Sequence, residues 1–196
     1  MKLGAVSPAL LAALVLLGAE PALRAEVVTV MAANLTTAGQ VYGDQAVRIF
    51  QALRPDVVLL QEFNVQTSRR AFVDAAFGTG YYFYCEPENG GLPNGIVSRF
   101  AIQTCGEWND ENIPNRDFAW AVIDLPGETD LQALSVHLKA GDKARDAERR
   151  RREAEQIKGY AASHFRADFY TVVGGDLNAQ HRLDPALAVL RTFLSP

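Results

Sequence analysis

Short apolar runs alternate along the chain with polar turns and with segments of helical pattern. Runs rich in aliphatic and β-branched residues predict strands at residues 27–33, 57–60, 96–98, 119–125, 131–138 and 169–173. Helices are predicted from Asp44 to the residue before Pro55, over 67–77 and over 143–165. A turn joins 119–125 to 131–138, so these two strands are expected to form an antiparallel pair.

Polar side chains stand where the apolar runs end. The run 169–173 leads into a glycine pair and then presents Asp176 and Asn178. Asp176 is suited to hold a divalent cation or orient a water, and Asn178 to donate to a phosphate oxygen. The alternative is a strand followed by an ordinary polar turn. Glu62 directly follows the run 57–60, where a carboxylate is costly unless it is paired, solvated or bound to a metal.

Two further polar residues occupy comparable positions. Asn34 follows the first strand and begins a polar turn. His137 alternates with apolar neighbours near the end of 131–138, a pattern that favours a satisfied core histidine over a catalytic one. Arg99, Arg116 and Lys139 are candidate phosphate contacts, against the usual interpretation of such residues as solvated surface charges.

Composition indicates one globular domain. The 196 residues are 48% hydrophobic and 21% charged, which suits a packed core and argues against disorder. The net charge of −4 disfavours a nonspecific nucleic-acid binder, because such binders depend on phosphate contacts, but it leaves a catalytic role open.

The first 25 residues predict a signal peptide. Lys2 supplies the positive charge, residues 9–17 are apolar, and Ala19, Ala22 and Ala25 offer small residues for cleavage. The alternative is an uncleaved anchor, although the apolar run is shorter than the roughly 20 residues of a membrane span. We therefore expect an exported protein, periplasmic or secreted, with no stable membrane span after cleavage.

Export to an oxidising compartment would permit a disulfide between the two cysteines. Cys85 follows an aromatic run and Cys105 a second strand-like run, with a glycine-rich turn between them. The sequence is compatible with a disulfide between neighbouring strands and also with two separate buried thiols. Neither cysteine has zinc-ligand spacing.

The basic run 149–152 lies within the predicted long helix. Acidic residues interleave with it, so the run is interpreted as a solvated helix face, with contact to a phosphate backbone as the alternative.

Five sequence words, taken together and in order, resemble the endonuclease/exonuclease/phosphatase family of metal-dependent phosphoesterases. They end at or near the polar residues described above: VTVMAAN34, DVVLLQE62, NGIVSR99, LSVH137 and GGDLN178. The resemblance covers the chain from about Val27 to Ala179, and the second and fifth words are its specific parts.

The resemblance implies an α/β fold, a four-layer α/β/β/α sandwich with two mostly antiparallel sheets packed face to face and helices outside. It implies that Glu62 ligates Mg²⁺ (or Mn²⁺ or Ca²⁺), that Asn34 contacts the metal or the phosphate, and that His137 and Asn178 bind the scissile phosphate. Asp176 would position or activate the attacking water. Neutralising the charge that develops on phosphate oxygens requires such hard oxygen ligands and hydrogen-bond donors.

The sequence also departs from the family pattern. Family members continue past the last word through further strands to a late Asp-His pair, whereas only residues 180–196 follow here. His181 is interpreted as a loop histidine rather than a replacement. Residues 26–196 are therefore expected to be a C-terminally incomplete domain, either a fragment or a shortened chain.

Three functions are compatible with these residues and with the resemblance. The first is an exported, metal-dependent nuclease with DNA or RNA as substrate. The second is the same chemistry on a phospholipid or an inositol phosphate. The third is a non-catalytic remnant that binds a phosphorylated ligand. No protein partner is implied.

Overall fold

The computed structural model describes residues 27–37, 40–41, 43–87 and 91–194. The predicted signal peptide over residues 1–25 lies outside them and stays a prediction. Among the described residues, no helix is both long enough and apolar enough to span a bilayer.

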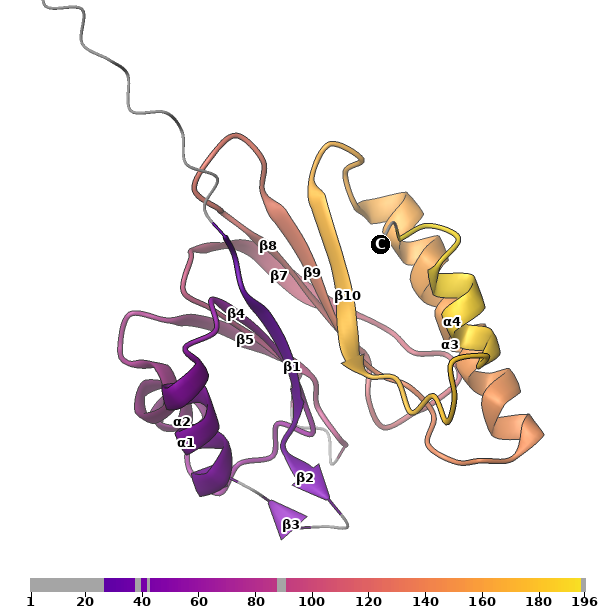
Figure 1. The fold of residues 1–196 in the computed structure, drawn as a ribbon, viewed down its shortest axis with the longest axis horizontal. Helices are drawn as coiled ribbons and strands as arrows, with labels where there is room; N and C mark the ends of the chain where they lie inside the picture. Colours follow the sequence, from indigo (N-terminus) through magenta and orange to yellow (C-terminus); the bar gives the residue numbers. More distant parts are fainter. Residues whose placement is uncertain (1–26, 38–39, 42, 88–90, 195–196) are drawn as a thin grey trace, which may run out of the picture.

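Two four-stranded sheets pack face to face at the centre of the molecule (Figure 1). The first has the strand order β1 (Val30–Asn34), β4 (Val57–Gln61), β6 (Gly95–Ser98) and β5 (Tyr82–Cys85). The second has the order β10 (Tyr170–Asp176), β9 (Leu131–His137), β8 (Phe118–Ile123) and β7 (Ile102–Trp108). A small hairpin of β2 (Thr36–Thr37) and β3 (Gln40–Val41) follows β1.

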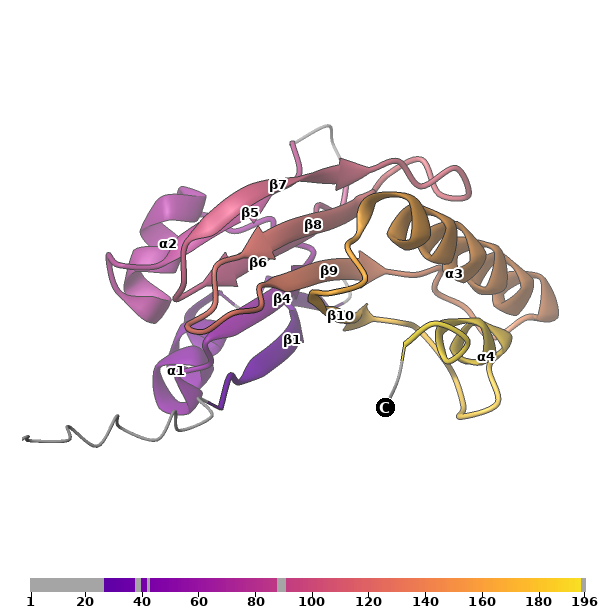
Figure 2. The same ribbon diagram turned by 90° about the horizontal axis from the view of Figure 1, so that it is seen from above.

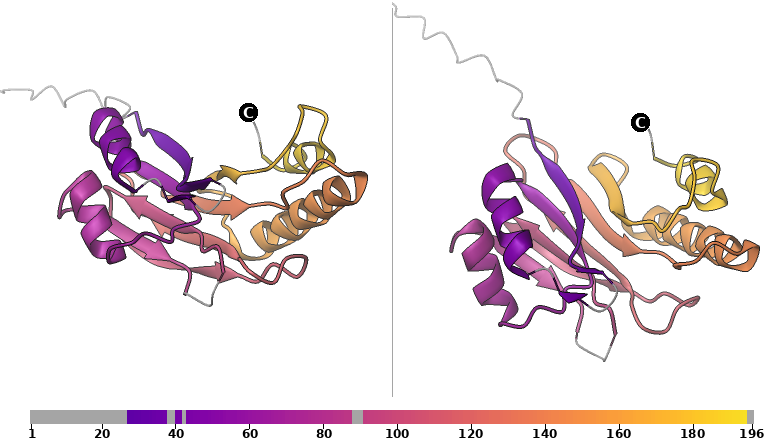
Figure 3. Two further views of the ribbon diagram at one scale, coloured as in Figure 1. Left: turned by 90° about the horizontal axis from the view of Figure 1, so that it is seen from below. Right: turned by 60° about the horizontal axis from the view of Figure 1, so that its bottom comes forward.

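Helices cover the two outer faces. The first sheet is flanked by α1 (Gly43–Leu53) and α2 (Arg69–Phe77), and the second by α3 (Ala144–His164) and α4 (Pro185–Leu190). Figure 2 shows both sheets lying between the two helix pairs, and the views of Figure 3 show the same order of layers. The predicted four-layer sandwich is confirmed.

Each sheet combines one parallel pair with two antiparallel pairs. β1 runs parallel to β4, with Asn34 opposite Gln61, and β10 runs parallel to β9, with Asp176 opposite His137. The remaining pairs are antiparallel, as predicted for β8 and β9. Parallel neighbours end at the same edge of a sheet, so the two parallel pairs bring polar strand ends together.

The central strands are buried on both sides. All five residues of β4 and all seven of β9 are buried. The period of two sends Val58 and Leu60 toward the cluster beneath α1 and α2, and Val57 and Leu59 toward the facing sheet. A third cluster lies between the second sheet, α3 and α4. This burial on both faces explains why 57–60 is a continuous apolar run.

The structure corrects two helix predictions. The helical spacing of Ala46, Ile49, Phe50 and Leu53 predicts that all four form the buried face of α1. Ala46 and Phe50 are buried, but Ile49 and Leu53 are 49% and 63% exposed, so this face is narrower than predicted. In α3, Arg150 is 1% exposed and does not belong to a solvated face. The neighbouring Arg149 is exposed, as expected. One arginine of the basic run therefore points into the protein, because a helical period places residue 150 on the same side as Ala154 and Ile157.

The disulfide considered between Cys85 and Cys105 is not formed. Both residues are thiols, on strands of different sheets. Cys85 packs with Phe83 against the cluster beneath α1 and α2, on the face of its sheet that points away from the second sheet. Cys105 is exposed on the edge strand β7, so the alternative of two buried thiols is also wrong for this residue.

Candidate active site

Four polar side chains from four strand ends meet at one edge of the sandwich. Asn34 ends β1, Glu62 follows β4, His137 ends β9 and Asp176 ends β10. Asn34 Nδ2 donates to Glu62 Oε1 at 3.2 Å and to Asp176 Oδ2 at 3.0 Å. His137 Nε2 lies 3.8 Å from Glu62 Oε1 and 3.6 Å from Asp176 Oδ2. Figure 1 shows β1 and β10, one from each sheet, ending near each other at this edge.

The Asn34 amide has a defined orientation. Its Oδ1 accepts a hydrogen bond from the Thr36 backbone N–H at 3.0 Å, an Asx turn that begins the β2–β3 hairpin. The oxygen is therefore engaged, and the nitrogen faces the carboxylates. Mg²⁺ takes oxygen ligands, so this geometry disfavours the metal-ligand role of Asn34. Both hydrogens of its amide bond Glu62 and Asp176, so Asn34 orients the two carboxylates.

The strands end in unusual backbone conformations. Glu62 has a φ of 53° and Asn178 a φ of 48°, both in the left-handed region that non-glycine residues rarely adopt. The backbone turns sharply after β4 and directs the Glu62 carboxylate toward the neighbouring strand ends. Strained positions of this kind are concentrated at functional sites.

The backbone at Gly175, the second residue of the glycine pair, requires a glycine. Its φ is 146°, and a Cβ at this position would overlap the Val136 carbonyl oxygen and lie 2.9 Å from Gln61 Nε2. A side chain here would push β10 away from β9. Glycine therefore permits the close approach that places Asp176 opposite His137.

A buried polar bridge lies one residue below the site. Gln61 Nε2 donates to Leu59 O at 3.0 Å and to Ser135 Oγ at 2.9 Å, and Ser135 Oγ donates to Leu60 O at 2.8 Å. These bonds join β4 of one sheet to β9 of the other, directly beneath Glu62 and His137. The sequence analysis did not assign a structural role to Gln61 or Ser135. The signals in the sequence are that Gln61 ends an apolar run and that Ser135 interrupts one.

His137 is both buried and part of the site. The interpretation as a core histidine and the interpretation as a site residue are therefore compatible. Its side chain is 4% exposed. Burial and the nearby Arg116 guanidinium lower the pKa of His137 to about 4, against the opposing effect of Asp176. The imidazole is therefore neutral at neutral pH, and its Nε2 faces the Glu62 and Asp176 carboxylates.

Arg116 is the candidate phosphate contact that the structure places at the site. It lies in the segment between β7 and β8 and is half-buried. Burial lowers the pKa of Arg116, while the carboxylates of Glu153, Glu62, Asp110 and Asp176 raise it. Arg116 Nε is buried and has no hydrogen-bond partner among the described residues. The guanidinium therefore lies within electrostatic range of Glu62 and Asp176.

Asn178 fastens the segment that follows His137. Its Nδ2 donates one hydrogen to Leu138 O at 3.0 Å, and its backbone N–H donates to Asp176 Oδ1 at 3.0 Å. A primary amide carries two N–H hydrogens, and the second is not needed for this bond. Asn178 thus orients both Asp176 and the end of β9.

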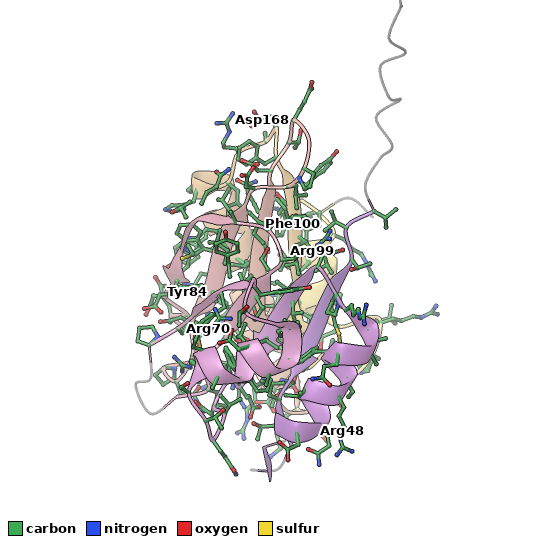
Figure 4. All side chains as sticks on the ribbon, turned by 90° about the vertical axis from the view of Figure 1, so that its left-hand side faces the viewer. Arg48, Arg70, Tyr84, Arg99, Phe100 and Asp168 are labelled. Atoms are coloured by element: carbon green, nitrogen blue, oxygen red, sulfur yellow. The ribbon has the colours of Figure 1, made fainter. Side chains whose placement is uncertain are left out.

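Arg99 is not at the site, and its predicted phosphate contact is wrong. β6 runs antiparallel to β4, so the end of β6 lies at the start of β4. Arg99 Nε pairs with Asp56 Oδ1 at 2.8 Å, and the guanidinium lies over the Phe100 ring. Figure 4 shows Arg99 and Phe100 together. Arg99 is hydrogen-bonded to Asp56, six residues before Glu62, a separation of about 20 Å at the rise of a strand.

His181 lies in the exposed segment between β10 and α4, in agreement with its interpretation as a loop histidine.

Comparison with known proteins identifies the family. The model of the Endonuclease/Exonuclease/phosphatase family matches residues 39–195. The chain belongs to this family. A comparison with curated proteins gives no match.

Solved structures of the family share the fold. D. rerio TDP2, humanized by 14 mutations, has a TM-score of 0.64 and 18% identity, covering 83% of this chain and 66% of its own. An AP endonuclease from Archaeoglobus fulgidus has a TM-score of 0.57 and 15% identity, covering 84% and 68%. An endonuclease/exonuclease/phosphatase from Beutenbergia cavernae has a TM-score of 0.56 and 21% identity, covering 77% and 47%. This chain spans about half to two thirds of the length of the similar structures.

The site fits the divalent cation that family members typically use. Two carboxylates, Glu62 and Asp176, are held by one amide hydrogen-bond donor, beside a neutral imidazole. Among the described residues, no three His, Cys, Asp or Glu side chains converge into a metal cage. Mg²⁺ does not need one, because it commonly binds through one or two carboxylates and completes its shell with waters and substrate phosphate.

Proposed function

We propose that this chain is a divalent-metal-dependent phosphodiesterase that acts on DNA or RNA. The observation that carries the proposal is the convergence of Glu62, Asp176, Asn34 and His137 at one edge of the sandwich, with Arg116 beside them. Family membership supports phosphoester hydrolysis as the chemistry.

In this proposal Glu62 holds Mg²⁺. A bound divalent cation neutralises charge on the phosphate oxygens and on the leaving oxygen. Asn34 Nδ2, whose two hydrogens bond Glu62 and Asp176, orients these carboxylates. His137 Nε2 donates to a non-bridging oxygen, and the Arg116 guanidinium adds a positive charge beside it. The low pKa of His137 suits this role, because a neutral imidazole donates without being protonated first.

Asp176 is the group proposed to orient the attacking water and to accept its proton. Its Oδ1 is held by the Asn178 backbone N–H and its Oδ2 by Asn34 Nδ2. Its side chain is 32% exposed, so water can reach the carboxylate. A carboxylate fixed at both oxygens is well placed to orient a water as a general base.

Nucleic acid is the substrate class best supported by the relatives. The similar structures include D. rerio TDP2 complexed with a single-strand DNA product, at 18% identity and a TM-score of 0.58, and the AP endonuclease. The negative net charge of this chain is compatible with an enzyme that holds one phosphate at a compact site rather than a long backbone.

The test is a substrate panel. Purified protein is incubated with single-stranded DNA, duplex DNA, RNA, a phospholipid and an inositol phosphate, in Mg²⁺, Mn²⁺, Ca²⁺ or EDTA. We expect metal-dependent cleavage of a nucleic acid. Cleavage of only a lipid or an inositol phosphate would show that the substrate is not a nucleic acid. Binding of a ligand by folded protein without hydrolysis would favour a non-catalytic binding protein.

Arg116→Met should weaken substrate binding. Loss of a charge-assisted contact to phosphate is expected to raise KM about 10-fold or more. The matched control is Arg48→Met on the exposed side of α1 (Figure 4), which should leave KM unchanged. Equal KM values for the two variants would remove Arg116 from the phosphate site.

We also propose that the protein is exported, on the basis of the N-terminal segment 1–25. The check is the intact mass of the protein recovered from its producer, before and after reduction. A mass corresponding to a chain that begins near residue 26 is expected, and it should not change on reduction, because both cysteines are free thiols. A retained N-terminus would contradict cleavage.

A further inference from the structure

A buried pair of carboxyl groups lies within electrostatic range of Arg116. Asp110, in the segment after β7, is 3% exposed, and Glu153, in the middle of α3, is 0% exposed. Their side chains are hydrogen-bonded to each other. The site described above uses neither residue.

The pair has one hydrogen-bonding arrangement. Asp110 Oδ1 accepts from the Asn112 backbone N–H at 2.8 Å, and Glu153 Oε2 accepts from the Lys139 backbone N–H at 3.0 Å. The other two oxygens, Asp110 Oδ2 and Glu153 Oε1, are buried and find no hydrogen-bond donor among the described residues while both groups are ionised. These oxygens are left for the carboxyl–carboxyl bond, and such a bond requires a proton. The pair therefore holds one proton and one negative charge.

Burial and Asp110 account for this protonation. Burial raises the pKa of Glu153 to about 8, with a further rise from Asp110 and an opposing effect of Arg116 and the Lys139 N–H. The pKa of Asp110 is also raised, mainly by burial. The charged groups that face the pair are Arg116 and, through the Asp110 N–H at 2.8 Å, the Asp117 carboxylate.

Four carboxyl groups raise the pKa of Arg116: Glu153 and Asp110 of the buried pair, and Glu62 and Asp176 of the candidate site. With one negative charge, the buried pair balances the guanidinium. With two negative charges, it would attract the guanidinium more strongly and lower the positive potential that Arg116 presents to a phosphate.

We infer that Asp110 and Glu153 act together as a single-proton carboxyl pair that positions Arg116 for the substrate phosphate. The inference rests on the proposed function for Arg116. Both residues are positioning residues, since they act through Arg116 and do not reach the reacting atoms.

The surrounding structure makes the arrangement rigid. Gln156, one turn after Glu153, donates to Asn109 O at 2.6 Å and accepts from the Asn112 side-chain amide at 3.1 Å. The segment that carries Asp110 and Arg116 is thereby fastened to α3. The same turn of α3 holds Lys139, two residues after His137, through Glu153.

Glu153→Gln is the discriminating substitution, because glutamine reproduces the protonated acid. Its oxygen can accept from the Lys139 N–H while its amide donates to Asp110 Oδ2, so the pair keeps one negative charge at every pH. The matched control is Glu155→Gln, the same change on the exposed face of the same helix.

The measurement is the affinity for a short oligothymidylate between pH 6.5 and 9.5, in EDTA so that no turnover occurs. In the wild type and in Glu155→Gln, affinity should fall about 10-fold across this range, the effect of weakening one charge-assisted contact. In Glu153→Gln it should stay nearly constant, and where turnover is measured KM rather than kcat should show the same difference. Parallel pH profiles for Glu153→Gln and the wild type would overturn the inference.

A second measurement separates this inference from the proposed function. The carboxyl carbon of Glu153 is followed by NMR as the pH is raised. Titration near pH 8 is expected in the wild type, whether or not the protein hydrolyses a phosphodiester. Titration near the ordinary glutamate pKa would refute the carboxyl pair even if the nuclease activity is found.

Discussion

Glu62→Gln is expected to reduce Mg²⁺-supported phosphodiester hydrolysis by about 10³-fold, the upper range for losing one electrostatic contact to the transition state. Glutamine keeps the shape and can still accept the hydrogen bond from Asn34 Nδ2, now 3.2 Å from Glu62 Oε1. It removes the negative charge that holds a hard cation. The measurements are the rate of oligonucleotide cleavage and the Mg²⁺ affinity by titration calorimetry.

The fold should survive this change. The Glu62 side chain is 16% exposed, and its carboxylate lies at the rim of the sandwich rather than in an apolar cluster. Glu111→Gln, at an exposed position of the segment before β8, is the matched control and should keep both activity and Mg²⁺ affinity. Full activity of Glu62→Gln in a folded protein would exclude Glu62 from the metal site.

Arg150→Met is expected to lower the free energy of unfolding by about 3–5 kcal/mol, the range for breaking a buried ion pair by removing one partner. Arg150 Nε and Nη2 donate to Asp184 Oδ2 at 2.9 and 2.7 Å, and Nη1 donates to Lys139 O and Gly141 O at 2.9 and 2.8 Å. Methionine fills part of the space but leaves the Asp184 carboxylate buried without a cation. Urea unfolding measures the loss.

Two further variants test the cause. Arg149→Met removes the adjacent, exposed arginine and should change stability by less than about 0.5 kcal/mol. Adding Asp184→Asn to Arg150→Met should recover part of the loss, because asparagine can still accept from the Ala186 N–H that begins α4, now 3.1 Å from Asp184 Oδ1. If Arg150→Met and Arg149→Met are equally stable, the buried pair contributes little.

The Arg150 contacts also connect stability to the site. Lys139–Gly141 follows directly after His137 and Leu138, and it is held by Arg150, by Glu153 and, through Leu138 O, by Asn178. A folded Arg150 variant at low temperature is therefore expected to show impaired positioning of His137 as well as lower stability.

The order and type of the elements were largely determined by the sequence. A continuous apolar run of four residues predicted a strand buried on both faces, and β4 is such a strand. The turn at 126–130 predicted the antiparallel pair of β8 and β9. These patterns are local, because the periods of two and 3.6 residues are properties of the strand and the helix themselves.

Most of the candidate site was also foreseen. Asn34, Glu62 and Asp176 were proposed because a polar group at the end of a buried strand requires a reason. The pattern around His137 favoured a core residue, and His137 became a site candidate through the family resemblance. The sequence did not determine how they meet. That depends on the parallel pairing of β1 with β4 and of β10 with β9, which joins residues far apart in the chain.

Only the tertiary structure decided the roles of the charged residues. Arg99 and Arg116 are both arginines beside a strand, yet the antiparallel direction of β6 carries Arg99 to the far end, and the segment before β8 brings Arg116 to the site. Arg149 and Arg150 are neighbours in one basic run, yet only Arg150 meets a buried carboxylate. Asp110 and Glu153 become a pair only when α3 packs beside the segment after β7. Local patterns specify which face a residue takes, but the cost of burying a charge depends on long-range partners, which no local pattern contains.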